Sequence, residues 1–229
     1  MAGSSLGEPG CEFAAALLVS ADRAATMRGV NVPLDLYLAS TSPRRSELLA
    51  RAGLRFALCE PGPEYAPGGG DEHASVVGEP RQLAEERATR KGLGAAVQDP
   101  RVPVLAVDTV VDLGGVELGK PRDRDHAEAM LRQLAGRHHF VHTAHFLRLP
   151  ATSFTALRTS TAEVACGALE PASLERYLAS GQWRGKAGSY GLQDDAQAFF
   201  RVVQGSFDTV VGLHVAAVRE LLAAARGQR

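Results

Sequence analysis

The sequence predicts an α/β fold, built as one large domain or two small ones. The chain has 229 residues, of which 45% are apolar and 22% charged, as in ordinary globular proteins with a substantial core. Two short apolar runs, residues 34–39 and 103–107, have the length and polar flanks of buried strands. Residues 125–134 instead carry apolar side chains at helical spacing. Strands and helices that alternate along the chain are typical of the α/β class.

The first predicted strand leads directly into a helix that begins at Pro43. Proline is favoured at this position, and the hydroxyl of Ser42 is expected to cap free backbone N–H groups. Arg44 and Arg45 lie in the first turn, where the helix dipole disfavours each cation by roughly 0.3–1 kcal/mol. A bound anion would compensate for this cost, so the stretch indicates a phosphate site. The alternative is that both arginines point into solvent.

The remaining elements follow from apolar patterning and from glycine and proline punctuation. Residues 1–33 are predicted to form a loosely attached extension. After the helix over 43–52 we expect a strand at 55–59, a long loop over 60–80, a helix over 81–97, a hairpin at 114–115, paired strands at 140–149 and 155–165, a helix over 171–180, a strand at 199–203 and a final helix over 215–225.

The second buried strand is predicted to end at Asp108 and Thr109. Open α/β sheets place their ligand chemistry at the carboxyl ends of strands, so Asp108 is a candidate functional carboxylate. The alternative is an aspartate that caps a turn. Glycines over residues 185–191 indicate close approach of the backbone to a ligand or a structural turn.

Four histidines crowd one predicted strand, at His138, His139, His142 and His145. Their spacing is not that of a zinc site. We therefore expect histidines on the strand surface or in turns.

Composition excludes several classes of partner. The net charge of −1 gives no general attraction to nucleic acid or to an anionic membrane. The apolar run at 13–19 is too short to span a bilayer, and the acidic residues before it argue against a secretory signal. Three widely spaced cysteines favour a reducing compartment, so we expect a cytoplasmic protein. There are only three lysines, at 91, 120 and 186, which draws attention to each.

Several ordered motifs resemble the Maf family of nucleotide pyrophosphatases, over residues 34–222. They are ASTSPRR at 39–45, VDTVV at 107–111, LGKP at 118–121, LAGRHH at 134–139, KAGSYGLQ at 186–193, GS at 205–206 and VVGL at 210–213. The resemblance implies an elongated two-lobed fold with a central mixed sheet flanked by helices, over residues 34–226. YGLQ at 190–193 resembles the branch that acts on dTTP and UTP.

By this resemblance the protein would hydrolyse nucleoside triphosphates to the monophosphate and pyrophosphate with Mg²⁺ or Mn²⁺, as a homodimer. The implied catalytic residues are Asp108, Lys120 and Arg45; the substrate-binding residues are Ser40, Arg44, Arg87, Lys186 and Gln193; and the metal ligands are Glu64 and Asp108. The alternative is a nucleotide-binding regulator of cell division on the same scaffold.

Four positions depart from the family pattern. Arg87 stands where a lysine is usual, and Asp194 and Asp195 where glycine is usual, while His214 replaces a proline. The loop that holds Glu64 is divergent, so Glu60 or Asp71 could take its place. These departures leave the substrate preference open.

Overall fold

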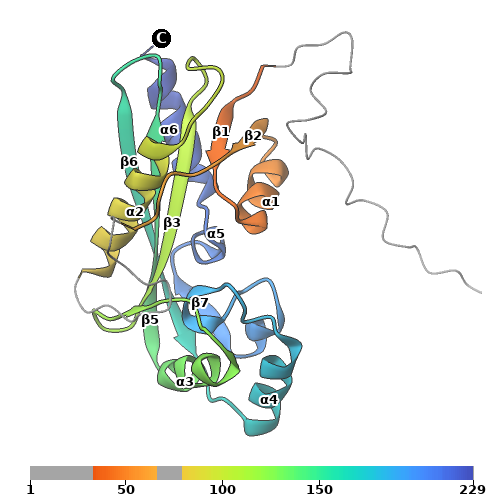
Figure 1. Cartoon of the computed structure of the whole chain (residues 1–229). Coiled ribbons are helices and arrows are strands. Elements are labelled where there is room, and N and C mark those ends of the chain that lie inside the picture. The colour runs from red at the N-terminus through yellow and green to blue at the C-terminus, as the bar shows by residue number, and fades with distance from the viewer. Residues whose placement is uncertain (1–32, 66–78, 229) are drawn as a thin grey trace, which may run out of the picture. The chain divides into compact units, whose positions relative to one another are not determined.

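The computed structural model describes residues 33–65 and 79–228. In this part of the chain seven strands form one mixed sheet with helices around it (Figure 1), which confirms the predicted α/β class. The expected extension, apart from Pro33, and the alternative metal ligand Asp71 lie outside the described residues. None of the described helices has the length and apolar character needed to cross a bilayer.

The strands of the sheet are β1 (Leu36–Ala39), β2 (Phe56–Cys59), β3 (Val104–Asp112), β4 (Glu117–Leu118), β5 (His138–Arg148), β6 (Thr155–Cys166) and β7 (Phe200–Gln204). Their order is β2-β1-β3-β5-β6-β7, and β4 pairs with β3 beside this path. β1 runs parallel to both β2 and β3, whereas the other neighbours are antiparallel. The predicted pairing of the two long strands over 140–149 and 155–165 is confirmed by β5 and β6.

The helices are α1 (Pro43–Arg51), α2 (Pro80–Gly94), α3 (Arg124–Leu134), α4 (Pro171–Ser180), α5 (Phe207–Val211) and α6 (Val215–Arg226), with 3-10 turns at Ala187–Ser189 and Asp195–Ala198. All helices but α5 were predicted. α2 ends three residues before the predicted boundary, at Gly94. α5 was not predicted because a single turn and a half of helix leaves no periodic pattern to read.

β3 does not end where the sequence suggested. It continues through Asp108 to Asp112, because β5 pairs with it along its whole length, from Val104 opposite Arg148 to Asp112 opposite Phe140. The prediction that Asp108 marks the end of a strand is therefore wrong. β1 stops at Ala39, opposite Ala106 of β3, so the following residues of β3 face the space beyond the end of β1.

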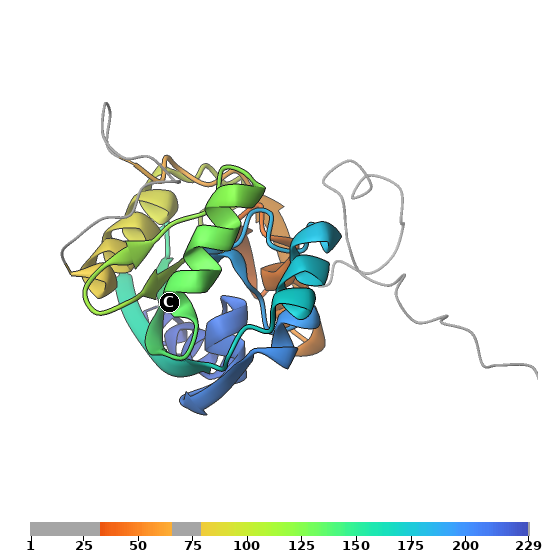
Figure 2. The same ribbon diagram turned by 90° about the horizontal axis from the view of Figure 1, so that it is seen from below.

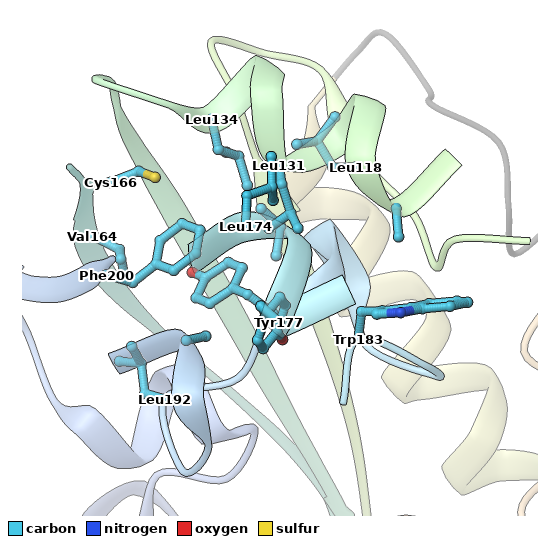
Figure 3. Packing of buried hydrophobic residues seen from close by; sticks show 14 of the residues in the cluster. Leu118, Leu131, Leu134, Val164, Cys166, Leu174, Tyr177, Trp183, Leu192 and Phe200 are labelled. Carbon is cyan, nitrogen blue, oxygen red and sulfur yellow. The ribbon is translucent and has the colours of Figure 1, made fainter. Parts of the chain in front are cut away.

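Two apolar clusters lie along the long strands. One includes residues of β3 before Asp108, and the other includes a residue of β3 after it. Leu105 and Val107 pack with β1, α1 and α6. Val111 packs with α3, α4 and β7, in a cluster rich in aromatic side chains (Figure 3). Figure 1 shows the first group of elements at one end of the long strands, and Figure 2, viewed from the other end, shows α3 and α4. Asp108 and Thr109 thus lie where one core gives way to the other.

Three of the four histidines on β5 are buried, so the expected surface placement is wrong for them. His139 is 1% exposed and its Nε2 lies 2.7 Å from the hydroxyl of Tyr190. His145 is fully buried and its Nε2 accepts a hydrogen bond from the backbone N–H of His214 at 2.8 Å. A proline at position 214 has no N–H, so the usual family residue could not make this bond.

We expect the protein to lose stability in mild acid because of these histidines. Burial lowers the pKa of His139 and of His145 from 6.5 to about 4. Both histidines stay neutral in the folded protein, while in the unfolded chain they take up protons below pH 6.5. Their contribution to the free energy of unfolding is therefore present above pH 6.5 and is lost as the pH falls toward 4. The loss should reach on the order of 2 kcal/mol per histidine at pH 5.

Urea unfolding at pH 7 and pH 5 measures this effect. His139→Phe should flatten the pH dependence of the free energy of unfolding. His138→Gln is the matched control, because the side chain of His138, next to His139 in the chain, is 56% exposed. Equal stability of the unsubstituted protein at the two pH values would contradict the prediction.

Candidate active site

A cleft of about 680 Å³ lies where β1 and β2 end, a size typical of small-molecule sites. Its walls come from widely separated parts of the chain. They are chiefly residues 39–45, residues 60–64, Lys91, Asp108, Thr109, Lys120, residues 184–187, Tyr190, Gly191, Gln193 and residues 210–212. The rule that ligands bind at the carboxyl ends of parallel strands therefore holds for β1 and β2, although not for β3.

The start of α1 brings Arg45 into this cleft. Its Nε donates to the backbone oxygen of Gly212 at 2.9 Å, Nη1 to the hydroxyl of Ser40 at 3.1 Å and Nη2 to the hydroxyl of Thr109 at 3.2 Å. Within residues 33–65 and 79–228, three of the five guanidinium N–H donors fix the side chain and two remain for a ligand. Arg45 does not simply point into solvent, as the alternative reading supposed.

The predicted cap of α1 is wrong in one detail. Ser42 occupies the N-cap position, but its side chain makes no capping hydrogen bond. Instead the hydroxyl of Ser40 accepts a hydrogen bond from the backbone N–H of Ser42 at 3.2 Å. Arg44, in the same first turn, also lines the cleft. The N-terminal turn of α1 therefore brings two arginines, Arg44 and Arg45, to the cleft, as an anion site at a helix N-terminus requires.

Two carboxylates and one lysine form a largely buried group in the same cleft. Nζ of Lys91 lies 2.6 Å from Oδ1 of Asp108 and 2.8 Å from Oε2 of Glu64. The side chains of Lys91, Asp108 and Glu64 are 11%, 6% and 25% exposed. Within the described structure Oδ2 of Asp108 is buried and has no hydrogen-bond partner. This oxygen is therefore open to a partner that the described residues do not supply.

The two carboxylates differ in their electrostatics. Burial raises the pKa of Asp108, and the nearby Glu64 adds to this, while Lys91 opposes it. Burial also favours a higher pKa for Glu64, but the charge and hydrogen bond of Lys91 outweigh it and hold that pKa below its usual value. A carboxylate with a raised pKa next to one that stays ionised is a frequent arrangement in acid–base catalysis.

The segment that carries Glu64 is fixed against α2. The backbone N–H of Gly62 donates to the backbone oxygen of Lys91 at 2.8 Å. A Cβ on Gly62 would lie 2.6 Å from Cα of Gly94, so only glycine allows this approach. Glu60 also lines the cleft, at the end of β2, but it is Glu64 that reaches the Lys91–Asp108 pair.

Arg87 lies outside the residues that line the cleft. Its guanidinium forms a two-pronged pair with the carboxylate of Glu117, whose Oε2 lies 2.9 Å from Nη2, and it stacks 4.9 Å from the ring centre of Tyr65. The side chains of Arg87 and Glu117 are only 9% and 5% exposed. This geometry gives Arg87 a role in joining α2 to β4, and its expected contact with substrate stays a prediction.

Replacing Arg87 should therefore cost stability. Arg87→Ala leaves the carboxylate of Glu117 buried without its partner, and we expect the free energy of unfolding to fall by about 3–5 kcal/mol. Urea denaturation measures the change, and Arg90→Ala, at a more exposed pair on the same helix, is the control. An increase in KM with unchanged stability would instead place Arg87 at the substrate.

The other expected site residues lie in the cleft. Lys120, Lys186 and Gln193 all line it. Nζ of Lys186 forms an ion pair with Asp194, one of the residues that depart from the family pattern. A Cβ on Gly191 would lie 3.1 Å from Oε1 of Gln193 and 3.2 Å from Cδ of Lys186, so both side chains lie over this glycine.

The residues fit a hard divalent cation only with help from a ligand. Among the described residues no group of three His, Cys, Asp or Glu side chains could hold a metal ion. Glu64 and Asp108 nevertheless supply carboxylate oxygens, and one buried oxygen of Asp108 has no partner within the described structure. Mg²⁺ is commonly bound through one or two carboxylates together with substrate phosphates, which matches this pair.

Sequence reasoning missed Lys91 and Thr109 as site residues. Lys91 lies one helical turn after Arg87 on α2, so the two side chains share a face of the helix. The scarcity of lysine in the chain singled it out, but its approach to Asp108 depends on how α2 packs on β3. For Thr109 the sequence carried no signal of a functional role other than its position next to Asp108.

Basic side chains and a pair of carboxylates, Asp108 and Glu64, line one cleft, as expected of a site for a phosphorylated substrate. The chain belongs to the Maf family, because residues 35–225 match the family described as Maf-like protein. It is 39% identical over 194 residues to the dTTP/UTP pyrophosphatase of Yersinia pestis (85% of this chain, 94% of that protein). It is 42% identical over 187 residues to the dTTP/UTP pyrophosphatase of Thermus thermophilus (82% and 92%) and 40% over 198 residues to that of Bordetella pertussis (84% and 93%).

Proposed function

We propose that the protein is a nucleoside triphosphate pyrophosphatase that cleaves dTTP and UTP to the monophosphate and pyrophosphate. The observation that carries the proposal is that Arg45, Asp108 and Glu64 line one cleft, with Arg45 bonded to Thr109 beside Asp108. The names of the similar proteins support the substrate class. A nucleotide-binding regulator would need the basic groups but not the pair of carboxylates formed by the buried Asp108 and the partly buried Glu64.

The basic residues would bind the triphosphate. Gly212, Ser40 and Thr109 hold Arg45, and two of its N–H donors have no partner among the described residues. Arg44 and Lys120 line the same cleft. Hydrogen bonds between guanidinium groups and phosphate are short and directional, so they orient the substrate as well as attract it. The side chains of Gln193 and Lys186, which lie against Gly191, would contact the base.

Asp108 would act as the base that takes a proton from the attacking water. Its pKa is raised by burial, its Oδ1 is held by Lys91, and its buried Oδ2 has no partner in the described structure. A carboxylate with these properties is positioned to accept a proton at Oδ2 while Oδ1 stays fixed. Glu64 and Asp108 would hold Mg²⁺ or Mn²⁺, which supplies neutralisation of the developing charge on the phosphates.

Product analysis with purified protein tests this function. The assay uses a panel of nucleoside triphosphates with Mg²⁺ or Mn²⁺ and scores pyrophosphate and orthophosphate separately. Pyrophosphate from dTTP or UTP is the expected result. Orthophosphate as the only product, or binding of nucleotides without any turnover, would contradict the proposal.

We also propose that the protein acts as a cytoplasmic homodimer. This part of the proposal rests on family resemblance and on the cysteine pattern of the sequence. Sedimentation of the purified protein over a range of concentrations measures the oligomeric state, and a monomer at all concentrations would contradict the dimer.

A further inference from the structure

The ammonium of Lys91 lies between the two carboxylates that are the proposed metal ligands. It is 2.6 Å from Oδ1 of Asp108 and 2.8 Å from Oε2 of Glu64, and its side chain is 11% exposed. Each contact is a hydrogen-bonded ion pair that is largely shielded from solvent. Lys91 therefore already places one positive charge where a divalent cation would bring two.

Lys91 is fixed at this position from both sides. Its backbone oxygen accepts from the N–H of Gly62, two residues before Glu64. Its own helix packs closely on β3 and β5, and a Cβ on Gly92 would lie 2.3 Å from the ring of Phe146. The nearest cation on the same helix face, Arg87, is occupied by Glu117 and cannot take over from Lys91.

We propose that Lys91 is a positioning residue that occupies the cation position between Glu64 and Asp108 and competes there with the divalent cation. Two cations so close together repel each other strongly in a site of low dielectric constant. A bound triphosphate relieves the competition, because its oxygens offer Lys91 a new partner and provide the further ligands that Mg²⁺ or Mn²⁺ requires. The divalent cation would then bind weakly to the free protein and tightly only together with nucleotide.

This inference rests on the proposed function, because it takes Glu64 and Asp108 as the metal ligands. Its test needs no turnover: Mn²⁺ binding to the nucleotide-free protein is measured by isothermal titration calorimetry. We expect Lys91→Met to bind Mn²⁺ about tenfold or more tightly than the unsubstituted protein, since the competing charge is gone. Lys91→Arg keeps the charge and should bind Mn²⁺ as weakly as the unsubstituted protein.

Lys186→Met is the matched control. It makes the same change in the same cleft, but Lys186 pairs with Asp194 and not with the two proposed ligands. Tighter Mn²⁺ binding in this variant as well would mean that the net charge of the cleft, and not the position of Lys91, sets the affinity, and would overturn the proposal. So would Mn²⁺ affinity that is unchanged or weaker in Lys91→Met.

A second variant covers the case in which Lys91→Met does not fold. Lys91→Gln removes the same charge while its amide can still donate to one carboxylate, and thermal unfolding shows that the protein is folded before the titration. The same gain in Mn²⁺ affinity is expected. Failure of the product assay would leave this result standing, whereas equal Mn²⁺ affinity in all variants would overturn the Lys91 proposal without affecting the proposed hydrolysis.

Discussion

Asp108→Asn should reduce kcat for nucleotide hydrolysis by about 10²–10⁴-fold, while the affinity for nucleotide changes only a few fold. An amide of the same shape can still accept a hydrogen bond from Lys91 but cannot take a proton from water. Steady-state kinetics give kcat, and titration with a non-hydrolysable analogue gives the affinity. The split between the two quantities identifies a group that acts in the reaction and not in binding.

Asp112→Asn is the matched control for this variant. Asp112 lies four residues further along β3, where its carboxylate accepts from the N–H of Gly115 and contacts His142, and it does not line the cleft. Its kcat should stay within a few fold of the unsubstituted enzyme. If Asp108→Asn lost affinity, stability and kcat together, Asp108 would be a structural residue.

Arg45→Ala should raise KM for the nucleoside triphosphate by about 10- to 100-fold and weaken inhibition by pyrophosphate to a similar extent. Hydrogen bonds to charged groups contribute about 1.5–3 kcal/mol each, which corresponds to this range. The effect on KM is expected because Arg45 is fixed by Ser40, Thr109 and Gly212 in a cleft wall. Inhibition constants for pyrophosphate check that the lost contact is with phosphate.

Two further variants separate the phosphate contact from the structural role of Arg45. Arg45→Lys keeps the charge but loses the fork, so its KM should lie between those of the alanine variant and the unsubstituted enzyme. Arg51→Ala, at the exposed last turn of the same helix, should leave KM unchanged. An unchanged KM in Arg45→Ala would remove this residue from the phosphate site.

Particular residues show how far the sequence leads toward the fold. The apolar spacing of Ala127, Met130, Leu131 and Leu134 predicted α3, and all four side chains are buried. Pro43 correctly marked the start of α1, and the glycine pair at 114–115 correctly marked a hairpin. These features could be predicted because they depend on neighbours within a few positions.

The same kind of reasoning failed where long-range contacts decide the structure. β3 continues past Asp108 because β5, some forty residues away in the chain, pairs with it along its whole length. His139 and His145 of β5 are buried because Tyr190 and the backbone of His214 provide partners that no local pattern reveals. Both results follow from tertiary hydrogen bonds, which override local preference.

The sequence by itself determined the α/β class and the Maf family membership, and it predicted a phosphate site at the start of α1 and a functional role for Asp108. Only the tertiary structure decided which cation accompanies that carboxylate. Arg87 and Lys91 lie one turn apart on α2, and the packing of this helix directs Arg87 to Glu117 and Lys91 to Asp108 and Glu64. The sequence shows which residues are charged, but the packing of the helices on the sheet determines which opposite charge each one pairs with.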